Sequence, residues 1–387
     1  MDFSLSSEQQ AIVDSIKGLM KDFDDDYWLE HDKTGEYPED FYQAVAAGGW
    51  LGITMPEEYG GSNLGVSEAA LMMMTIAEGG GMSAASAVHI NIFGPHPIVK
   101  FGTDEQKQRW LPPLIQGKQK TCFGVTEANA GLDTTRIETF ARREGDNYII
   151  NGQKIWTTTA QQADKIMMLA RTTPRDECEK PHEGISLFYA DMDPEHVEIK
   201  EIEKMGRKCV NSNMTFYDNL VVPKADLIGE EGKGFRYILH SLNPERMLLA
   251  SESVGMGRSA LERATQYAKD REVFGRPIGM NQSVQHPLAE NWVELEAAYL
   301  MIMSAASRYD NGLDCGAQAN GSKYFAAEAG FKACQQAVMT HGGMGYAKEY
   351  HVERLMREAM LPRLAPVSQN MILNFISTNV LGLPRSY

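Results

Sequence analysis

The cysteines are the residues whose spacing could most directly encode metal or disulfide chemistry. The chain contains Cys122, Cys178, Cys209, Cys315 and Cys334, an odd-numbered set with no CxxC pair and no regular spacing. Zinc sites and disulfide frameworks both need a recognisable spacing. We therefore expect reduced thiols and no metal site.

Two polar segments contain acidic side chains, but neither identifies a reaction by itself. The segment Thr126-Glu127-Ala128-Asn129-Ala130-Gly131-Leu132-Asp133, taken alone, is typical of a polar loop. In Asn243-Pro244-Glu245-Arg246, the asparagine can cap a helix, the proline can be its first residue, and the glutamate then favours the helix dipole. The meaning of both segments depends on the elements around them.

The charge balance limits the ligands that the chain can bind. A net charge of -15 repels phosphate backbones, and no basic run counters it, so we expect no nucleic-acid partner. A smaller anionic ligand such as a nucleotide can still bind through backbone N–H groups and a few arginines.

Length and composition are typical of a globular enzyme built from two or three modules. The chain has 387 residues, of which 43% are hydrophobic and 23% charged. It begins Met1-Asp2-Phe3 without a basic segment or an apolar leader region, and no stretch reaches the ~18 uncharged apolar residues of a spanning helix. We expect a cytoplasmic protein with no membrane insertion.

The first module, residues 1–120, has helical periodicity. Ser6 and Ser7, followed three residues later by Gln9 and Gln10, predict a helix start, and apolar residues then repeat with helical spacing up to Phe23. Further helices are predicted at about 40–47, 67–77 and 104–114, separated by turns such as Gly60-Gly61 and Pro112-Pro113.

The second module, residues 121–230, has the pattern of a small β domain. The segment 147–156 predicts two strands around an Asn151-Gly152 turn. Short β-like runs follow at 165–170, 185–190, 214–217 and 220–222. We expect these strands to form a compact, β-barrel-like domain.

The third module, residues 231–387, returns to long helical segments. Helices are predicted at about 235–271, 283–310, 317–340 and 350–360, and Gly312 and Gly342 are typical helix ends. Because the connections are short, we expect an antiparallel four-helix bundle. The predicted fold class is a multidomain α+β protein.

Several ordered blocks resemble the acyl-CoA dehydrogenase family. The segment 126–133, followed by Gly145-Asp146, by 151–156 and by Thr158, resembles the family's Thr-Glu-Pro-x-Ala-Gly-Ser-Asp to Trp-Ile-Thr signature. The later blocks Arg271-x-x-Phe274-Gly275 and Gly342-Gly343-x-Gly345-Tyr346 follow in the family's order. The resemblance covers almost the whole chain and implies the same helical, β and four-helix-bundle domains.

The resemblance implies FAD-dependent removal of the α and β hydrogens of an acyl-CoA thioester. Family members need a flavin held against the β carbon and a carboxylate base whose pKa is raised by burial. Electrons pass to electron-transfer flavoprotein. An enoyl-CoA reductase, a flavin oxygenase of the same fold and a catalytically inactive flavin-binding scaffold are the alternatives.

For the flavin, the resemblance implies one group of residues around the ring system. They are Phe123, Val125, Thr126, Gly131, Leu132, Trp156, Thr158, Ser368 and Asn370. Trp156 is expected against the ring, with the threonine hydroxyls as hydrogen-bond partners. On the local sequence alone, the preferred explanation is that Trp156 is a core aromatic residue ending a strand and that the threonines merely favour β structure; the ordered family blocks favour the flavin role instead.

A second group is expected to hold the ADP part of FAD from a neighbouring subunit. It consists of Arg271, Phe274, Gln282, Met339, Gly342 and Gly343. Glycines allow close backbone approach to a pyrophosphate, and arginine is a permanent positive charge. If FAD is shared in this way, the protein is a homodimer or homotetramer. The alternative is a surface arginine and an ordinary helix-ending glycine pair.

The catalytic base departs from the commonest family pattern. Many members carry a glutamate near the C-terminus where this chain has Ala365-Pro366-Val367, and proline cannot accept a proton. In isovaleryl-type and some long-chain dehydrogenases, the base lies on the first long bundle helix, and that position matches Glu245. We therefore expect Glu245 to be the base, with Leu132, Asn243, Arg246 and Val367 contacting the substrate.

Overall fold

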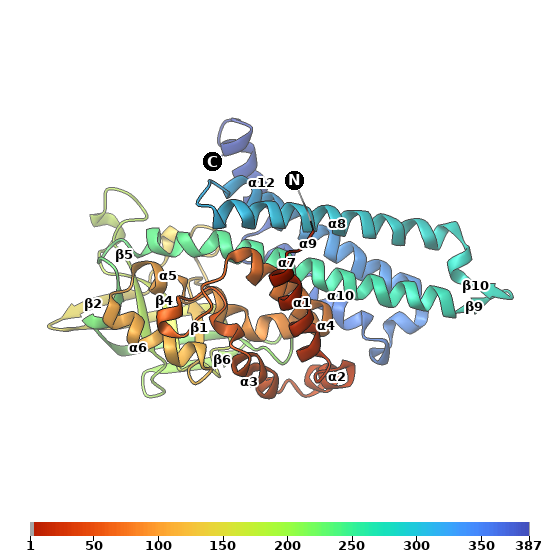
Figure 1. Cartoon of the computed structure of the whole chain (residues 1–387). Helices are drawn as coiled ribbons and strands as arrows, with labels where there is room; N and C mark the ends of the chain where they lie inside the picture. Colours follow the sequence, from red (N-terminus) through yellow and green to blue (C-terminus); the bar gives the residue numbers. More distant parts are fainter. Residues whose placement is uncertain (1–3, 387) are drawn as a thin grey trace.

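The computed structural model describes residues 4–386. Met1, Asp2 and Phe3, on which the expectation about the N-terminus partly rests, lie outside the described residues. A β-sheet lies at one end of the molecule, and long helices extend from it to the other end (Figure 1). This arrangement confirms the predicted fold class of a helical region, a middle β region and a C-terminal helical region.

The N-terminal region is helical, as predicted. Its helices are α1 (Ser7–Met20), α2 (Asp25–Thr34), α3 (Glu39–Ala47), α4 (Val66–Phe93), α5 (His96–Phe101) and α6 (Asp104–Ile115). Ser6 caps α1 in a reciprocal pair of hydrogen bonds with Gln9, which confirms the predicted helix start. The prediction that Pro112-Pro113 forms a turn is wrong, because both prolines lie inside the last turns of α6.

Helix α4 is much longer than the predicted segment 67–77. It continues past a kink at Gly81, whose φ of 74° is readily adopted only by glycine, and it is buried along almost its whole length. A helix that is buried on all sides has no polar stripe, so its pattern does not show the usual amphipathic period. This buried helix packs along α7 (Gly234–Asp270).

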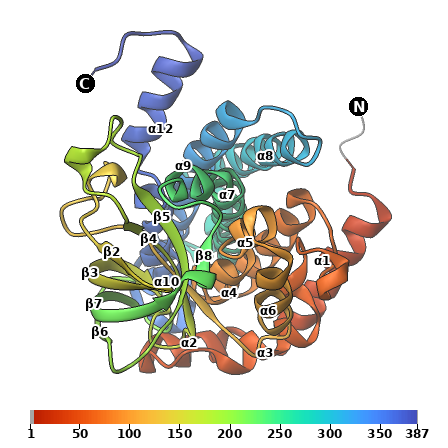
Figure 2. The ribbon, with the colours of Figure 1, turned by 90° about the vertical axis from the view of Figure 1, so that its left-hand side faces the viewer.

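The β region is one sheet in which strand order differs from sequence order. Its strands are β1 (Thr121–Gly124), β2 (Phe140–Glu144), β3 (Asn147–Thr158), β4 (Lys165–Arg171), β5 (Ile185–Asp191), β6 (Val197–Glu201), β7 (Ser212–Pro223) and β8 (Leu227–Ile228). The order is β6-β7-β3-β2-β4-β5-β8, and β1 pairs in parallel with β4. Figure 2 shows this sheet lying beside the helices.

The predicted hairpin turn at Asn151-Gly152 is wrong. The segment is a single strand, β3, and the turn lies earlier, at Gly145-Asp146, where β2 and β3 pair antiparallel. Gly152 marks a β-bulge instead, because the register against β7 shifts there and a Cβ atom would lie 2.5 Å from the Thr139 hydroxyl. The two short runs predicted at 214–217 and 220–222 are likewise one strand, β7.

The C-terminal region contains three long helices and several short ones. They are α7, α8 (Gln282–Asp310), α9 (Gly316–His341), α10 (Val352–Glu358), α11 (Leu361–Leu364) and α12 (Gln369–Phe375), with a small β9 (Glu272–Val273) and β10 (Arg276–Pro277) ribbon between α7 and α8. The three long predictions are confirmed. The fourth predicted helix, 350–360, has only the seven residues of α10.

Gly255 allows α7 to approach α4 closely, and its replacement is expected to destabilise the fold. A Cβ at this position would lie 2.0 Å from the backbone carbonyl oxygen of Met74 in α4. Gly255→Ala is therefore expected to lower the free energy of unfolding by about 1–3 kcal/mol or more, since the backbone must move. Gly321→Ala in α9 is the control, because its nearest neighbour is a flexible methionine at 3.5 Å.

Denaturant unfolding of both variants checks this expectation. In a helix interior, alanine is favoured over glycine by about 0.5–1 kcal/mol, so the Gly321 variant should gain stability. Equal stability of the two variants would show that the α4–α7 contact relaxes freely.

Candidate active site

Glu245 lies in the interior of helix α7, eleven residues after its first residue. The prediction that Asn243 could cap a helix with Pro244 at its first position is therefore wrong, and the dipole explanation for Glu245 falls with it. Pro244 has no N–H, so the carbonyl of His240 lacks its usual helical donor at this point. Such an interruption is tolerated here because α7 is packed between other helices.

The Glu245 carboxyl group is buried without a full set of partners. Only 8% of the residue is exposed, and among the described residues its Oε2 atom has no hydrogen-bond partner. Burial raises its pKa to about 7, while His89, Arg246 and Lys323 act against this rise. A carboxyl group with this pKa is present near neutral pH in both protonation states, which suits a general base.

Arg246 and Asn243 lie beside the glutamate on the same helix. The Arg246 Nη1 donates to the Asn243 side-chain oxygen at 2.9 Å, while its Nε has no partner among the described residues. Asn243 also contacts the sulfur of Cys315, at the start of α9, at 3.7 Å. A half-buried guanidinium whose buried Nε has no partner, beside a buried carboxyl group, is a site prepared for a polar ligand.

Lys323 ties the C-terminal segment to this site. Its ammonium group donates to the backbone carbonyl of Val367 at 2.7 Å, and burial lowers its pKa to about 8. Lys323 also interacts electrostatically with Glu245 and Arg246. The structure thus brings Val367 close to the glutamate helix, and Ser368, which caps α12, follows directly.

A line of aromatic rings connects β1 with helix α4. Phe123 packs against Phe93 with ring centroids 5.4 Å apart, and Phe93 packs against His89 at 4.8 Å. The next residues of the segment are fixed by β3, because Lys154 donates to the Val125 carbonyl and Ile155 donates its N–H to the Thr126 carbonyl. The side of β1 that carries Phe123 therefore faces the helix that reaches the Glu245 region.

Trp156 is turned out of the protein by an irregularity in β3. The register against β7 shifts between Lys154 and Thr157, and Trp156 has a φ of 62°. Its side chain is 55% exposed, so the alternative that it is a core aromatic residue is wrong. Thr158 then resumes regular pairing with Ser212. A large exposed aromatic residue in a strained backbone position is a candidate ligand contact.

Gly131 and Leu132 lie in an exposed loop. Leu132 is 64% exposed, and a Cβ on Gly131 would meet nothing within 4 Å. Within residues 4–386, no hydrogen bond, ion pair or ring contact joins either residue to Glu245.

The second group of predicted cofactor residues lies at the far end of the long helices. Arg271 directly follows α7, 26 residues after Glu245, which corresponds to about 39 Å along the helix axis. Phe274 in the β9–β10 ribbon has a φ of 52° and is fully exposed. Figure 1 shows this ribbon at the opposite end of α7 from the sheet.

The end of α9 lies beside the same end of α7. The rings of Tyr267 and His341 stack with centroids 4.2 Å apart. Met339 is 69% exposed, and Gly342, with a φ of 61°, ends α9 as predicted. The structure therefore gathers Arg271, Phe274, Gln282, Met339, Gly342 and Gly343 at one end of the helices and Glu245 near the other.

Sequence reasoning missed three buried polar residues around the base. They are His89, Glu252 and Lys323, none of which belongs to a recognised motif. The sequence contains only weak signs of their role. Glu252 lies seven residues after Glu245 and so on the same helix face, and His89 interrupts an apolar run. Polar residues in such positions need partners, and the structure gives each of the three at least one hydrogen-bond partner.

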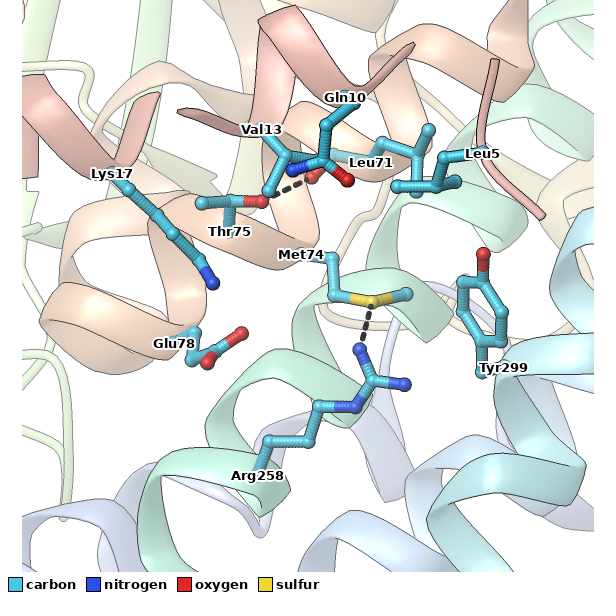
Figure 3. Close-up of a pocket in the computed structure, with 10 residues that line it drawn as sticks. All are labelled: Leu5, Gln10, Val13, Lys17, Leu71, Met74, Thr75, Glu78, Arg258 and Tyr299. Carbon is cyan, nitrogen blue, oxygen red and sulfur yellow. Dashed lines mark hydrogen bonds between the residues drawn. The ribbon is translucent and has the colours of Figure 1, made fainter. Parts of the chain in front are cut away.

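A cavity of about 300 Å³ lies elsewhere, between α1, α4, α7 and α8. Figure 3 shows Arg258 extending to the sulfur of Met74 at 3.3 Å, with Glu78 and Tyr299 nearby. None of the predicted site residues lines this cavity. We assign it no role in the reaction.

Residues 4–386 contain neither a candidate metal cluster nor a candidate membrane span. No group of three or more histidine, cysteine, aspartate or glutamate side chains in that range could hold a metal ion. In the same range, no helix is long and apolar enough to span a membrane.

Three family models match successive parts of the chain. They are the acyl-CoA dehydrogenase N-terminal domain at residues 6–118, the middle domain at residues 122–220 and the C-terminal domain at residues 232–381.

Relatives match along nearly the full length. The chain is 38% identical to acyl-CoA dehydrogenase FadE12 of Mycobacterium tuberculosis, covering 100% of this chain and 99% of the relative. It is 35% identical to the caffeyl-CoA reductase-Etf complex subunit CarC of Acetobacterium woodii, covering 85% and 86%. The solved structure of butyryl-CoA dehydrogenase from Megasphaera elsdenii is 29% identical, with a TM-score of 0.94 and coverage of 98% and 100%.

Proposed function

The chain belongs to the acyl-CoA dehydrogenase family and is an FAD-dependent flavoprotein, and from this premise we propose that it oxidises an acyl-CoA thioester to the trans-2-enoyl-CoA. The observation that carries the proposal is the buried carboxyl group of Glu245, with an unpartnered oxygen and a pKa raised by burial to about 7. This is the state that abstraction of a weakly acidic α proton needs. We infer that Glu245 is the base, as in isovaleryl-type members.

The residues of the chain fit an FAD molecule in two places. Trp156 and Phe274 are large aromatic residues held outward by positive φ angles, where an unliganded surface gains nothing from them. Near Phe274, Arg271 supplies a permanent charge and Gly342 a backbone open to close approach. We propose that the first place receives the flavin ring, with Phe123, Val125, Thr126 and Thr158, and the second the ADP part.

The proposed reaction is a removal of two hydrogens with formation of a carbon–carbon double bond. Glu245 accepts the α proton, and the β hydrogen leaves with its electron pair. Bound FAD supplies the acceptor for that hydride. Burial of Glu245 keeps water away from the carboxylate, and the neighbouring positive charges of Arg246 and Lys323 stabilise it before it takes the proton.

The wide separation of the two cofactor groups supports a shared site between subunits. Arg271 lies about 39 Å along α7 from Glu245, beside which the flavin ring must lie to receive the β hydrogen, so we infer that the ADP part of the same FAD is held by another chain. We propose a homodimer or a larger homo-oligomer in which each FAD contacts two chains. Helix α8 supports this, since Trp292 and Val293 are each more than half exposed and close to Leu300 and Met301 on the same helix.

We propose an electron-transfer flavoprotein as the acceptor of the electrons. The name of the relative CarC places that protein in a complex with such a partner. Several further points stay predictions. The chain is expected to divide at about residues 120 and 230, and the protein is expected to be cytoplasmic. The expected substrate contacts are Leu132, Asn243, Arg246 and Val367, and further expected cofactor contacts are Gly131, Leu132, Ser368 and Asn370.

A reductase working in the opposite direction is the second candidate. The observation that favours it is the 35% identity to CarC, which is named as a caffeyl-CoA reductase subunit. The same carboxyl group would then deliver a proton to the α carbon, which its pKa of about 7 also allows.

Product analysis separates the two candidates. The FAD-loaded protein is incubated with saturated acyl-CoA thioesters of different length and branching and an electron acceptor, and in parallel with enoyl-CoA thioesters and a reductant. We expect faster conversion of a saturated thioester to the trans-2-enoyl product. Conversion only of the enoyl thioester would support the reductase, and no conversion in either direction would support an inactive scaffold.

A further inference from the structure

A second acid–base pair is buried near Glu245. The Nδ1 atom of His89 in α4 lies 2.5 Å from the Oε1 atom of Glu252 in α7. The Glu252 side chain is fully buried and that of His89 is 11% exposed. Among the described residues, the second oxygen of Glu252 has no partner. Burying two ionisable groups costs desolvation free energy, which their mutual attraction and hydrogen bonding must offset.

The geometry places this pair on the same side of α7 as the base. Glu252 follows Glu245 by seven residues, almost two helical turns, so both side chains leave the helix on the same face about 10 Å apart along its axis. His89 reaches that face from α4, which packs along α7. Through Phe93, the same histidine also contacts Phe123 of the proposed flavin site.

The charged groups facing Glu245 come from three helices. Arg246 and Glu252 lie on α7, His89 on α4 and Lys323 on α9. His89 is opposed in turn by Arg207, a buried side chain from the loop before β7 that donates to Ser86 at 2.9 Å. Burial by itself lowers the pKa of His89, but Glu252, through its charge and its hydrogen bond, and Glu245 together raise it, so the net direction is upward.

We propose that His89 and Glu252 form a positioning pair for the base, in which Glu252 keeps His89 protonated and the imidazolium supplies the positive charge that faces Glu245 from α4. This proposal rests on the proposed function, because it assigns the pair its role through Glu245. The pair touches no reacting atom in this account. Its effect is to hold the Glu245 carboxylate available at neutral pH.

The direction in which each substitution shifts the pKa of Glu245 follows from the charges that it removes. In His89→Gln the positive charge is lost while the Glu252 carboxylate remains, so Glu245 faces uncompensated negative charge and its pKa should rise by about one unit. In Glu252→Gln, the histidine loses the partner that keeps it charged, and both charges disappear together. The double variant His89→Gln with Glu252→Gln also lacks both, so its shift should be smaller than that of His89→Gln alone.

Infrared difference spectroscopy across pH measures this directly on the FAD-loaded protein without turnover. The carbonyl stretch of protonated Glu245 is assigned by its absence in Glu245→Gln, and its midpoint is followed in each variant. We expect the largest upward shift in His89→Gln and a partial return toward the wild-type midpoint in the double variant. A purely structural pair would not give this partial return, because its losses would add.

The matched control is His96→Gln. His96 is a half-buried histidine bonded to the Tyr309 hydroxyl at 2.9 Å, and it is not among the charged groups that shift the pKa of Glu245. Its replacement should leave the Glu245 midpoint unchanged. An unshifted midpoint in His89→Gln, or an equal shift in His96→Gln, would overturn the proposal. Because the readout is protonation, it stands apart from the proposed function, which fails if no saturated thioester is converted to the enoyl product.

Discussion

Replacing Glu245 by glutamine is expected to lower kcat by roughly 10²–10⁴-fold, because a positioned general base contributes about that much. Glutamine has the same shape and keeps the helix intact, but its amide cannot accept the α proton. The protein should remain folded and yellow, since Oε2 makes no hydrogen bond that the variant would lose. Steady-state turnover with an artificial electron acceptor and a panel of acyl-CoA thioesters measures the loss.

A matched control lies on the same helix. Glu262 is an exposed glutamate of α7, and Glu262→Gln makes the same chemical change without touching the buried site. It should turn over at the wild-type rate. Comparable losses in the two variants would mean that the effect comes from the helix and not from the base.

The pH dependence of the wild-type rate should follow the titration of Glu245. Because the deprotonated carboxylate is the active form and its pKa is about 7, the rate of the proton-abstraction step should fall as pH drops below that value and reach a plateau above it. A rate that stays constant from pH 6 to 8 would show that Glu245 does not titrate in this range.

Mixed dimers are expected to recover about half of the wild-type activity from two inactive chains, because each complete site combines residues of both subunits. One chain carries Glu245→Gln and the other Arg271→Glu, which reverses the charge proposed to hold the pyrophosphate. In a mixed dimer, one site combines the Glu245→Gln position of the first chain with the Arg271→Glu position of the second and has both defects. The other site combines the unchanged Glu245 of the second chain with the unchanged Arg271 of the first. The chains are coexpressed with different tags, and the doubly tagged species is purified and assayed.

Each variant alone provides the control for this experiment. A homodimer of either chain has a defect in both sites and should be nearly inactive, Glu245→Gln through the base and Arg271→Glu through poor FAD retention. A mixed dimer as inactive as its parents would contradict the shared site, since each site would then carry the one defect of its own chain.

The sequence predicts the helical regions well where a helix has one apolar face. The predicted ends of α7, α8 and α9 each agree with the structure to within a residue or so, since Gly234, Gly312 and Gly342 mark several of them. Helix α4 was cut short because its second half is buried on every side and begins at Gly79-Gly80-Gly81, which interrupts the period. Whether a glycine ends a helix or only kinks it depends on packing that the local sequence does not contain.

The strands show the same dependence on tertiary context. Asn-Gly favours a hairpin turn, but Gly152 is needed for a different reason, the close approach of Thr139. Pairing of β3 with β7, more than fifty residues away, decides that the chain continues straight. A local preference worth a fraction of a kcal/mol yields to a long ladder of backbone hydrogen bonds.

For the candidate site, the sequence identifies those residues that lie in or next to a motif resembling the family's. Glu245 was found because its alternative position is occupied by Pro366. The environment that tunes it was not found, because His89, Glu252 and Lys323 come from segments separated by up to 234 residues and share no motif. Electrostatic coupling is a property of the folded arrangement, and only the structure brings these charges together.

The most direct test of Glu245 as the base is an anaerobic single-turnover titration of the FAD-loaded wild type and of Glu245→Gln with the same acyl-CoA thioester. Bleaching of the flavin absorbance follows the reaction without any acceptor, and a spectral shift without bleaching reports binding alone. We predict rapid bleaching in the wild type and only the binding shift in the variant. Bleaching at the wild-type rate in Glu245→Gln would contradict the central claim.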